Sequence, residues 1–399
     1  MPHLVLVILL LLLAGCGSLR EQRSLSLGDA LPVVESRWAT SVGDLVGKPQ
    51  QSFIPQIAAD RVYFATPEGQ LSARTLTSGE LQWQLDLNEG LSAGPGVGGG
   101  MVLVGSQNAE LIAVSETAGK PLWRAATCSE MLAAPVVNGG KVFVQCIDGQ
   151  LEALDAATGK ALWHYHRTPP ALTLRGSSMP LVEGQHVIAG FADGKLVAVN
   201  SDTGEPQWEA TIAVPRGRTD LERMVDIDGP LSSAAGVVFV TSFQGRIAAV
   251  SLDNGRVLWA REMSSYTGTA LGPGEVLVSD VDGKLWALDR NTGATLWRQE
   301  GFANKVLTTP LSTNGVVLEA DSQGNLYWLG SADGKILARQ NMADLWRQFY
   351  PDWRDEENEQ DPPKHSISVL PIGSGDMVLV RDDTGALLAL QIHNAVNTQ

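Results

Sequence analysis

The sequence predicts an all-β protein: an eight-bladed β-propeller made of four-stranded antiparallel blades. Three observations predict it, namely a recurring segment, the alternation of residue types within that segment, and a final copy that is cut short. The clearest copy, DGQLEALDAATGKALW, runs from Asp148 to Trp163. The related copies end at Trp83, Trp123, Trp208, Trp259, Trp297 and Ala338, and a truncated copy covers Asp383 to Ile392. A self-similar period of roughly 40 to 50 residues is typical of propellers and solenoids.

Each copy of the segment is expected to supply two strands of a blade. Leu151, Ala153 and Asp155 alternate with Glu152 and Leu154, which is the period of a strand. The sequence DAATG at 155–159 is typical of a turn, because aspartate opens tight turns and glycine accepts the left-handed conformation that closes them. A second hairpin precedes each copy, as in AAPVVNGGKVFVQC at 133–146. Four short antiparallel strands per repeat correspond to one propeller blade.

The blade count follows from the inner hairpins. They begin near Pro55, Pro95, Pro135, Pro180, Pro230, Leu271, Pro310 and Pro371, which makes eight. The eighth lacks a downstream TG-x-x-x-W strand, whereas SRWATSVGD near the N-terminus carries Trp38 in the equivalent setting without a preceding TG turn. We therefore expect the N-terminal strand to join the C-terminal blade and close the ring, which removes exposed sheet edges.

The tryptophans of the repeat are interpreted as architectural. A residue present in nearly every blade is expected to pack one blade onto the next and not to form an aromatic ligand box. The shared position is occupied by Trp38, Trp83, Trp123, Trp163, Trp208, Trp259 and Trp297. Ala338 breaks the series, which predicts a looser contact between the last two blades.

The N-terminus resembles the export signal of a bacterial lipoprotein. An apolar run from Leu4 to Leu13 is too short to span a bilayer but suits the core of a signal peptide. The Leu-Ala-Gly-Cys box that follows resembles a lipoprotein processing site, which implies cleavage before Cys16 and lipidation of that cysteine. By the same resemblance, Gly17 in place of aspartate favours retention in the outer membrane.

These features divide the chain into three parts. Residues 1–15 are expected to be the signal peptide, 16–31 the lipidated N-terminus with a polar tether, and 32–399 the propeller. The net charge of -15 argues against nucleic acid or anionic lipid as a partner, because both require a basic surface. Attachment to the membrane is therefore expected to depend on the lipid chains.

Two further cysteines, Cys128 and Cys146, flank one inner hairpin. They either pair as a stabilising disulfide in an oxidising periplasm or serve as two small buried apolar residues. The sequence leaves both alternatives open.

Several motifs that could indicate chemistry have a structural interpretation. Residues 90–94 fit G-x-S-x-G and residues 94–99 fit G-x-G-x-x-G, but both lie between strands, where no helix follows to form a nucleophile elbow or bind a pyrophosphate. His164 and His166 share one face of a strand without a third ligand at useful spacing. We therefore expect no catalytic residue, no metal and no cofactor.

The repeat x-L-x-A-L-D-x-x-T-G-x-x-L-W resembles that of quinoprotein dehydrogenase propellers and lacks the signature of WD40 repeats. Those dehydrogenases use adjacent cysteines and a calcium-bound quinone cofactor, but this chain has no Cys-Cys pair and no matching acidic cluster. A lipoprotein box followed by eight such blades resembles the BamB family, the lipoprotein subunit of the outer-membrane β-barrel assembly (BAM) complex. The resemblance covers Trp38 to Ile392.

Two irregular loops sharpen this resemblance. The sequence separation between the repeat tryptophan and the start of the next inner hairpin is 12 residues for Trp83 and Trp123. It is 17 residues for Trp163 and 22 residues for Trp208. Loops that depart from a regular scaffold are where function tends to lie. The two stretches are similar to the BamB loops that contact BamA, the barrel subunit, which implies that five residues are partner contacts: Leu172, Leu174, Arg175, Asp226 and Asp228.

The resemblance implies a non-enzymatic scaffold for outer-membrane protein assembly, on the periplasmic face of the outer membrane of a Gram-negative bacterium. It is expected to be a monomer within a hetero-oligomeric complex that binds the BamA periplasmic domains. Nascent outer-membrane proteins are a further candidate partner, through strand addition at blade edges. Two alternatives stay open: a periplasmic propeller that binds a small ligand or peptide, and a quinone-dependent dehydrogenase.

An inserted segment at 343–363 departs from the family pattern. It combines Trp346, Phe349, Tyr350 and Trp353 with a run of acidic residues. This composition predicts a short helix or a rim loop, which either contacts a partner or covers part of the propeller face.

Overall fold

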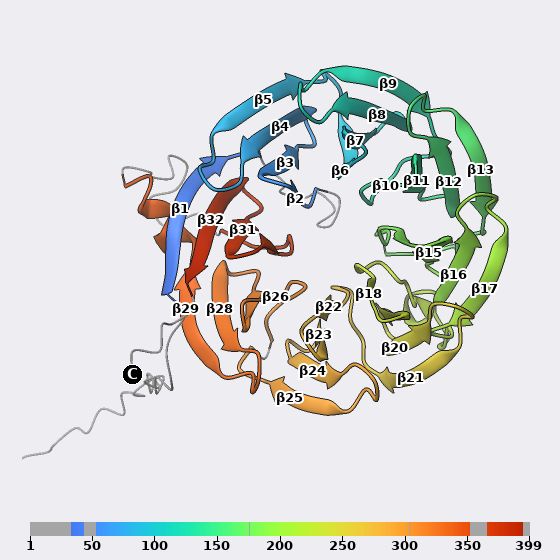
Figure 1. Ribbon diagram of the computed structural model, residues 1–399. Coiled ribbons are helices and arrows are strands. Elements are labelled where there is room, and N and C mark those ends of the chain that lie inside the picture. The colour runs from blue at the N-terminus through green and yellow to red at the C-terminus, as the bar shows by residue number, and fades with distance from the viewer. Residues whose placement is uncertain (1–32, 44–52, 175, 303, 352–364, 394–399) are drawn as a thin grey trace, which may run out of the picture.

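The computed structural model describes residues 33–43, 53–174, 176–302, 304–351 and 365–393. In this part of the chain, 32 strands form eight four-stranded antiparallel sheets arranged as a ring (Figure 1). The predicted eight-bladed propeller is therefore confirmed. The expected signal peptide and tether, with Cys16, lie outside the described residues, as do Arg175 and residues 352–363 of the insertion.

Blades 1 to 4 follow one another along the chain, each running from its inner to its outer strand. Blade 1 consists of β2 (Gln56–Ala58), β3 (Arg61–Ala65), β4 (Gln70–Thr75) and β5 (Leu81–Asp86). Blade 2 consists of β6 (Leu91–Gly98), β7 (Met101–Ser106), β8 (Glu110–Ser115) and β9 (Pro121–Ala126). Blade 3 consists of β10 (Val136–Asn138), β11 (Lys141–Gln145), β12 (Gln150–Asp155) and β13 (Ala161–His166). Blade 4 consists of β14 (Leu181–Glu183), β15 (His186–Gly190), β16 (Lys195–Asn200) and β17 (Pro206–Thr211).

Blades 5 to 7 repeat this order, and blade 8 combines the two ends of the described chain. Blade 5 consists of β18 (Ser232–Ala234), β19 (Val237–Thr241), β20 (Arg246–Ser251) and β21 (Val257–Glu262). Blade 6 consists of β22 (Ala270–Leu271), β23 (Glu275–Ser279), β24 (Leu285–Asp289) and β25 (Thr295–Gln299). Blade 7 consists of β26 (Leu311–Thr313), β27 (Val316–Ala320), β28 (Asn325–Gly330) and β29 (Ile336–Asn341). Blade 8 consists of β30 (Ile372–Ser374), β31 (Met377–Arg381), β32 (Ala386–His393) and β1 (Val33–Ser41).

The ring closes where β1 pairs with β32. The register runs antiparallel from Val34 opposite Ile392 to Ser41 opposite Ala386, with a shift between Ser36 and Trp38. The N-terminal strand is thus the outer strand of the C-terminal blade, as the sequence predicts.

Burial along a blade explains the sequence pattern of its strands. The second strand is almost fully buried, as in β15 and β27, because neighbouring blades cover both of its faces. The outer strand β13 instead alternates between exposed and half-buried side chains, since only one of its faces packs on the molecule.

Seven junctions between blades share one contact. The repeat tryptophan of one blade lies on the glycine that closes the turn between the third and outer strands of the next, where an added Cβ would come within 2.3–2.6 Å of ring carbons. These glycines have φ between +62° and +72°, which is the left-handed region that favours glycine. The tryptophan Nε1 also donates a hydrogen bond of 2.8–3.0 Å to a backbone carbonyl of the next blade. The donor–acceptor pairs are Trp38–Leu76, Trp83–Glu116, Trp123–Ala156, Trp163–Ser201, Trp208–Leu252, Trp259–Arg290 and Trp297–Ser331.

The junction between blades 7 and 8 is built differently. Blade 7 has Ala338 at the tryptophan position, and blade 8 has no turn between its third and outer strands to receive a ring, because its outer strand comes from the N-terminus. The short helix α1 (Met342–Arg347), which starts directly after β29 and is capped by the Asn341 side chain, packs into this junction instead.

The inward face of α1 joins the two blades. Its buried residues Met342, Leu345 and Trp346 belong to one core cluster with residues of β27 and β28 in blade 7 and of β31 and β32 in blade 8. Tyr350 stacks on the Trp346 ring at 4.5 Å and donates a hydrogen bond to the Ala39 carbonyl of β1 (3.2 Å). The looser contact expected at Ala338 is therefore wrong, because the start of the insertion fills the junction.

We predict that Trp346→Ala lowers the free energy of unfolding by about 3 kcal/mol or more, the usual cost of truncating a buried tryptophan. Chemical denaturation followed by far-UV circular dichroism measures the change. Leu296→Ala, at an exposed position on β25, is the control and is expected to leave the midpoint nearly unchanged. Equal midpoints for wild type and Trp346→Ala would show that α1 does not hold the two blades together.

Candidate functional site

Two long loops lie on one rim of the propeller, next to each other in blade order. The first rim loop, residues 167–180, connects β13 to β14, and the second rim loop, residues 212–231, connects β17 to β18. Each starts against the turn between the second and third strands of its own blade: Arg167 N donates to Gly149 O and Ile212 N to Gly194 O, both at 2.9 Å. The same rim therefore carries these turns and both loops.

The two rim loops are joined by a direct contact. The Leu174 backbone N–H donates to Asp226 Oδ1 at 2.9 Å. Gly176 faces Asp228 so closely that an added Cβ would lie 2.6 Å from the carboxyl carbon. The structure thus brings together Leu174, Asp226 and Asp228, three of the five residues predicted as partner contacts.

The other two predicted partner contacts are Leu172 and Arg175. Leu172 in the first rim loop is 43% exposed, as expected for a residue that touches a partner. Arg175 lies outside the described residues. Asp226, in contrast, is buried at 1% exposure, so it holds the loops together from inside and does not face solvent.

A run of consecutive buried residues fixes the second rim loop. Met224, Val225 and Ile227 are buried around Asp226, and the Ile227 side chain packs on Gly190, where an added Cβ would lie 2.2 Å from Ile227 Cγ2. The Asp226 carbonyl accepts a hydrogen bond from Phe243 N at 2.9 Å. The loop is therefore anchored to blades 4 and 5 along its buried half.

The exposed half of the second rim loop is ordered by local hydrogen bonds. It contains the 3-10 helix η1 (Leu221–Arg223), whose Glu222 carboxylate accepts from the backbone of Arg218 (2.6 Å) and Thr219 (3.3 Å). Gln244 donates to the Leu221 carbonyl at 3.3 Å, which ties this helix to blade 5. The Leu221 side chain itself is exposed.

The two carboxyl groups of the second rim loop have perturbed acidities. Burial raises the pKa of Asp226 to about 6, although the hydrogen bond from Leu174 opposes this change. Burial and the nearby Asp226 charge raise the pKa of Asp228 well above its usual range. Asp226 Oδ2 has no hydrogen-bond partner among the described residues. The site therefore holds two carboxyl groups that bind a proton more readily than exposed carboxyl groups do.

A cavity of about 240 Å³ lies between blades 3 and 4 beside the first rim loop. Its apolar walls include Pro169, Pro170, Leu174, Phe191 and Ile227, and its polar groups include Gln145, Arg167, Asp193 and Asp228. Both rim loops contribute residues to it. Sequence reasoning missed the cavity, because its walls come from segments far apart in the chain that only blade packing brings together.

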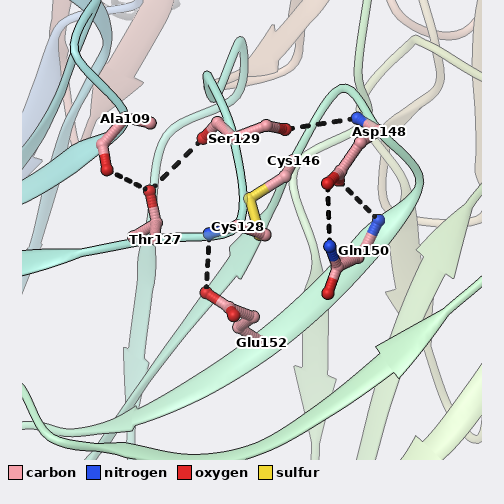
Figure 2. Close-up of a disulfide and its surroundings, with 8 residues drawn as sticks. All are labelled: Ala109, Thr127, Cys128, Ser129, Cys146, Asp148, Gln150 and Glu152. Carbon is pink, nitrogen blue, oxygen red and sulfur yellow. Dashed lines mark hydrogen bonds between the residues drawn. A yellow bond between two sulfur atoms is a disulfide. The ribbon is translucent and has the colours of Figure 1, made fainter.

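A disulfide joins Cys128 and Cys146 next to this cavity, with a Cα–Cα distance of 6.2 Å (Figure 2). It links the loop between blades 2 and 3 to the end of β11, and Cys146 lines the cavity. Cys128 N donates to Glu152 Oε2 at 3.2 Å, and Asp148 N donates to Ser129 Oγ at 3.3 Å (Figure 2). Closing a loop across a sequence separation of 18 stabilises a fold by roughly 3 kcal/mol.

Among the described residues, the potential metal ligands form no open site. Within the described ranges, one group of three residues has suitable ligand spacing, Cys128, Cys146 and Glu152, but its two sulfur atoms are bonded to each other. His164 and His166 are exposed on β13, opposite Glu152 and Gln150. Residues 91–98, which cover most of the two glycine motifs, form the strand β6.

In the described part of the chain, no helix has the length and hydrophobicity to span a bilayer.

The raised pKa of Asp226 predicts a pH effect on stability. The folded-state pKa of about 6 exceeds the unfolded value of about 3.9, so this group's contribution is complete below pH 4 and is lost as the pH rises through 6. Asp226→Asn removes the ionisation, and its amide oxygen still accepts the Leu174 hydrogen bond. As the pH rises from 4 to 7, the urea midpoint of the wild-type protein is expected to fall relative to that of Asp226→Asn. Asp86→Asn, at an exposed position, serves as control. If the difference in urea midpoint between Asp226→Asn and wild type does not vary with pH, the prediction is contradicted.

Comparison with known proteins identifies relatives along nearly the whole propeller. A family model described as outer membrane protein assembly factor BamB matches residues 67–299 and 274–396. The protein of that name from Pseudomonas aeruginosa is 41% identical over 344 residues, covering 85% of this chain and 90% of the relative. The corresponding protein from Alkalilimnicola ehrlichii is 37% identical over 390 residues (98% and 96% covered), and that from Escherichia coli is 30% identical over 356 residues (85% and 91%).

Solved structures show the same fold. The crystal structure of BamB from Moraxella catarrhalis has a TM-score of 0.77 at 23% identity and covers 90% of this chain and 100% of that one. Quinohemoprotein alcohol dehydrogenase from Comamonas testosteroni has a TM-score of 0.66 at 14% identity, covering 90% and 76%, which is a likeness of fold alone. From the family model and the sequence relatives together, the chain belongs to the family of the outer membrane protein assembly factor BamB.

Proposed function

We propose that this protein is a non-enzymatic scaffold of the BAM complex that docks on the periplasmic domains of BamA through its two rim loops. The relatives named as outer membrane protein assembly factors support the role in assembly. The observation that supports the docking surface is the Leu174–Asp226 hydrogen bond, which holds the two loops together as one surface.

The shape and polarity of this surface suit a protein partner. Leu172, Ile147 and Met179, on the first rim loop and the neighbouring turn of blade 3, are all exposed large apolar side chains. Apolar anchors surrounded by polar groups are typical of binding hot spots. The rigid attachment of both loops to blades 3, 4 and 5 lowers the entropic cost of ordering them on binding.

The proposed location is the periplasmic face of the outer membrane, with the lipidated Cys16 as anchor. The support for this anchor is the Leu-Ala-Gly-Cys box at residues 13–16, since Cys16 itself lies outside the described residues. The net charge of -15 is unfavourable for electrostatic attachment to anionic lipid, so the lipid chains would supply the affinity.

Nascent outer-membrane proteins are proposed as a second partner. The outer strands β9 and β13 each expose a leucine directly before the repeat tryptophan, at Leu122 and Leu162, and β5 exposes Leu81 two residues before Trp83. A free strand edge with apolar side chains suits an incoming β-strand by strand addition. Barrel assembly that is unchanged after these edges are blocked by proline substitutions would argue against this contact.

We predict that Leu172→Ala and Arg175→Ala each weaken binding to the periplasmic domains of BamA from the same organism. Loss of a hot-spot residue costs about 2 kcal/mol or more, which is roughly thirtyfold in affinity. Isothermal titration calorimetry on the folded variants measures the change.

Leu122→Ala is the matched control, because Leu122 is also an exposed leucine but lies on the outer strand β9. Wild-type binding with no loss in either loop variant contradicts the proposed interface. Absence of wild-type binding contradicts docking on BamA altogether.

A further inference from the structure

We propose that the Cys128–Cys146 disulfide positions the docking surface, because it holds the turn of blade 3 on which the first rim loop begins. This turn, the blade 3 turn, is residues 146–149 between β11 and β12. The inference rests on the proposed docking function and makes the affinity for the partner depend on the redox state of the two cysteines. It is carried by a chain of contacts that runs from the disulfide through the blade 3 turn to the first rim loop.

The blade 3 turn contacts the loops on both sides of its blade. Ile147 N donates to the Glu130 carbonyl of the preceding loop at 3.0 Å. The Gly149 carbonyl accepts from Arg167 N, the first residue of the first rim loop, at 2.9 Å. A movement of the blade 3 turn is therefore passed on to the first rim loop.

The disulfide is a covalent link at the start of the blade 3 turn (Figure 2). Cys146 is the first residue of the turn, and Cys128 lies in the loop between blades 2 and 3. The same loop holds the turn by the hydrogen bond from Asp148 N to Ser129 Oγ at 3.3 Å. A group at the surface exchanges such a hydrogen bond for one to water at little net cost, whereas a disulfide keeps its two segments together. Removal of the disulfide is therefore expected to loosen the turn.

The first rim loop begins in close contact with Gly149. An added Cβ there would lie 1.9 Å from the Arg167 carbonyl oxygen and 3.3 Å from Pro169 Cδ. The rings of Pro169 and Pro170 fix φ, which limits how far the loop can absorb a movement of its start. Leu172 follows two residues after Pro170. The position of the exposed Leu172 side chain therefore depends on the blade 3 turn.

The blade 3 turn also presents an apolar side chain of its own. Ile147 is exposed and directly follows Cys146. The disulfide thus orders two apolar anchors of the docking surface, Ile147 in the turn and Leu172 in the loop, which lowers the entropic cost of binding. The second rim loop is anchored to blades 4 and 5 by its own buried residues, so it provides an internal reference.

The first experiment measures binding of the BamA periplasmic domains to the double variant Cys128→Ala/Cys146→Ala by isothermal titration calorimetry. Alanine is chosen because Cys146 is buried in an apolar cluster. The double variant is expected to bind about tenfold more weakly than wild type, since the turn and loop must then be ordered on binding. Trp346→Ala is the matched control, because it removes a stabilising contact at the junction between blades 7 and 8, and it is expected to bind as wild type.

The second experiment measures amide hydrogen exchange by NMR in the wild-type protein without the partner, with and without dithiothreitol. Ile147 N and Arg167 N are the probes. Phe243 N (2.9 Å) and Met263 N (3.1 Å) are the reference, because they make the equivalent hydrogen bonds in blade 5, which has no cysteine. Reduction is expected to speed exchange at the two probes by about tenfold or more and to leave the reference amides unchanged.

The outcomes separate the two proposals. If Leu172→Ala weakens binding but the double variant binds as wild type, the role of the disulfide is overturned and the docking surface stands. An equal loss of affinity in Trp346→Ala also overturns it, because reduced stability would then explain the effect. Exchange that speeds up at all four amides, or at none, contradicts the proposal, and this result decides if the double variant does not fold. If wild type does not bind the BamA domains, the docking proposal fails, and exchange alone decides whether the disulfide holds the first rim loop.

Discussion

The structure depends on one repeated contact, a tryptophan ring laid on a left-handed glycine of the next blade. The glycine leaves room for the ring, and the indole nitrogen donates to a carbonyl in the same neighbouring blade. This contact explains why the turn glycine and the tryptophan occur together in the repeat: each of blades 1 to 6 receives a ring on its turn glycine and sends its own tryptophan to the next blade four residues later. The contact fixes the relative position of adjacent blades, and thereby the positions of the loops between them.

The candidate site lies where two such contacts follow each other. Trp163 lies on Gly204 between blades 3 and 4, and Trp208 lies on Gly255 between blades 4 and 5. The two rim loops start a few residues beyond these tryptophans, so the blade contacts set the distance across which Leu174 reaches Asp226. At the eighth junction, where the ring must close with two chain ends, α1 supplies apolar contacts in place of the tryptophan.

The sequence predicts most of the fold because the repeat carries it. Strand period, TG turns and the tryptophan spacing give the blade count, and the truncated last copy indicates ring closure by the N-terminal strand. The helix α1 could be expected only as one of two alternatives, and its place between blades 7 and 8 depends on packing that no local pattern encodes. The site is predicted less completely: loop length reveals the rim loops, but burial of Asp226 and the cavity around Gln145 arise from segments that meet only in the folded ring.

The most direct measurement compares Gly204→Ala with Gly184→Ala by equilibrium unfolding. Both glycines belong to blade 4 and have positive φ, 72° and 58°, so both substitutions carry a similar backbone penalty of about 1 kcal/mol. An added Cβ at Gly204 would lie 2.6 Å from the Trp163 ring, whereas at Gly184 it would meet nothing within 4 Å. If the tryptophan–glycine contact holds the blades together, Gly204→Ala loses about 2 kcal/mol more than Gly184→Ala. Equal losses for the two variants would contradict that claim.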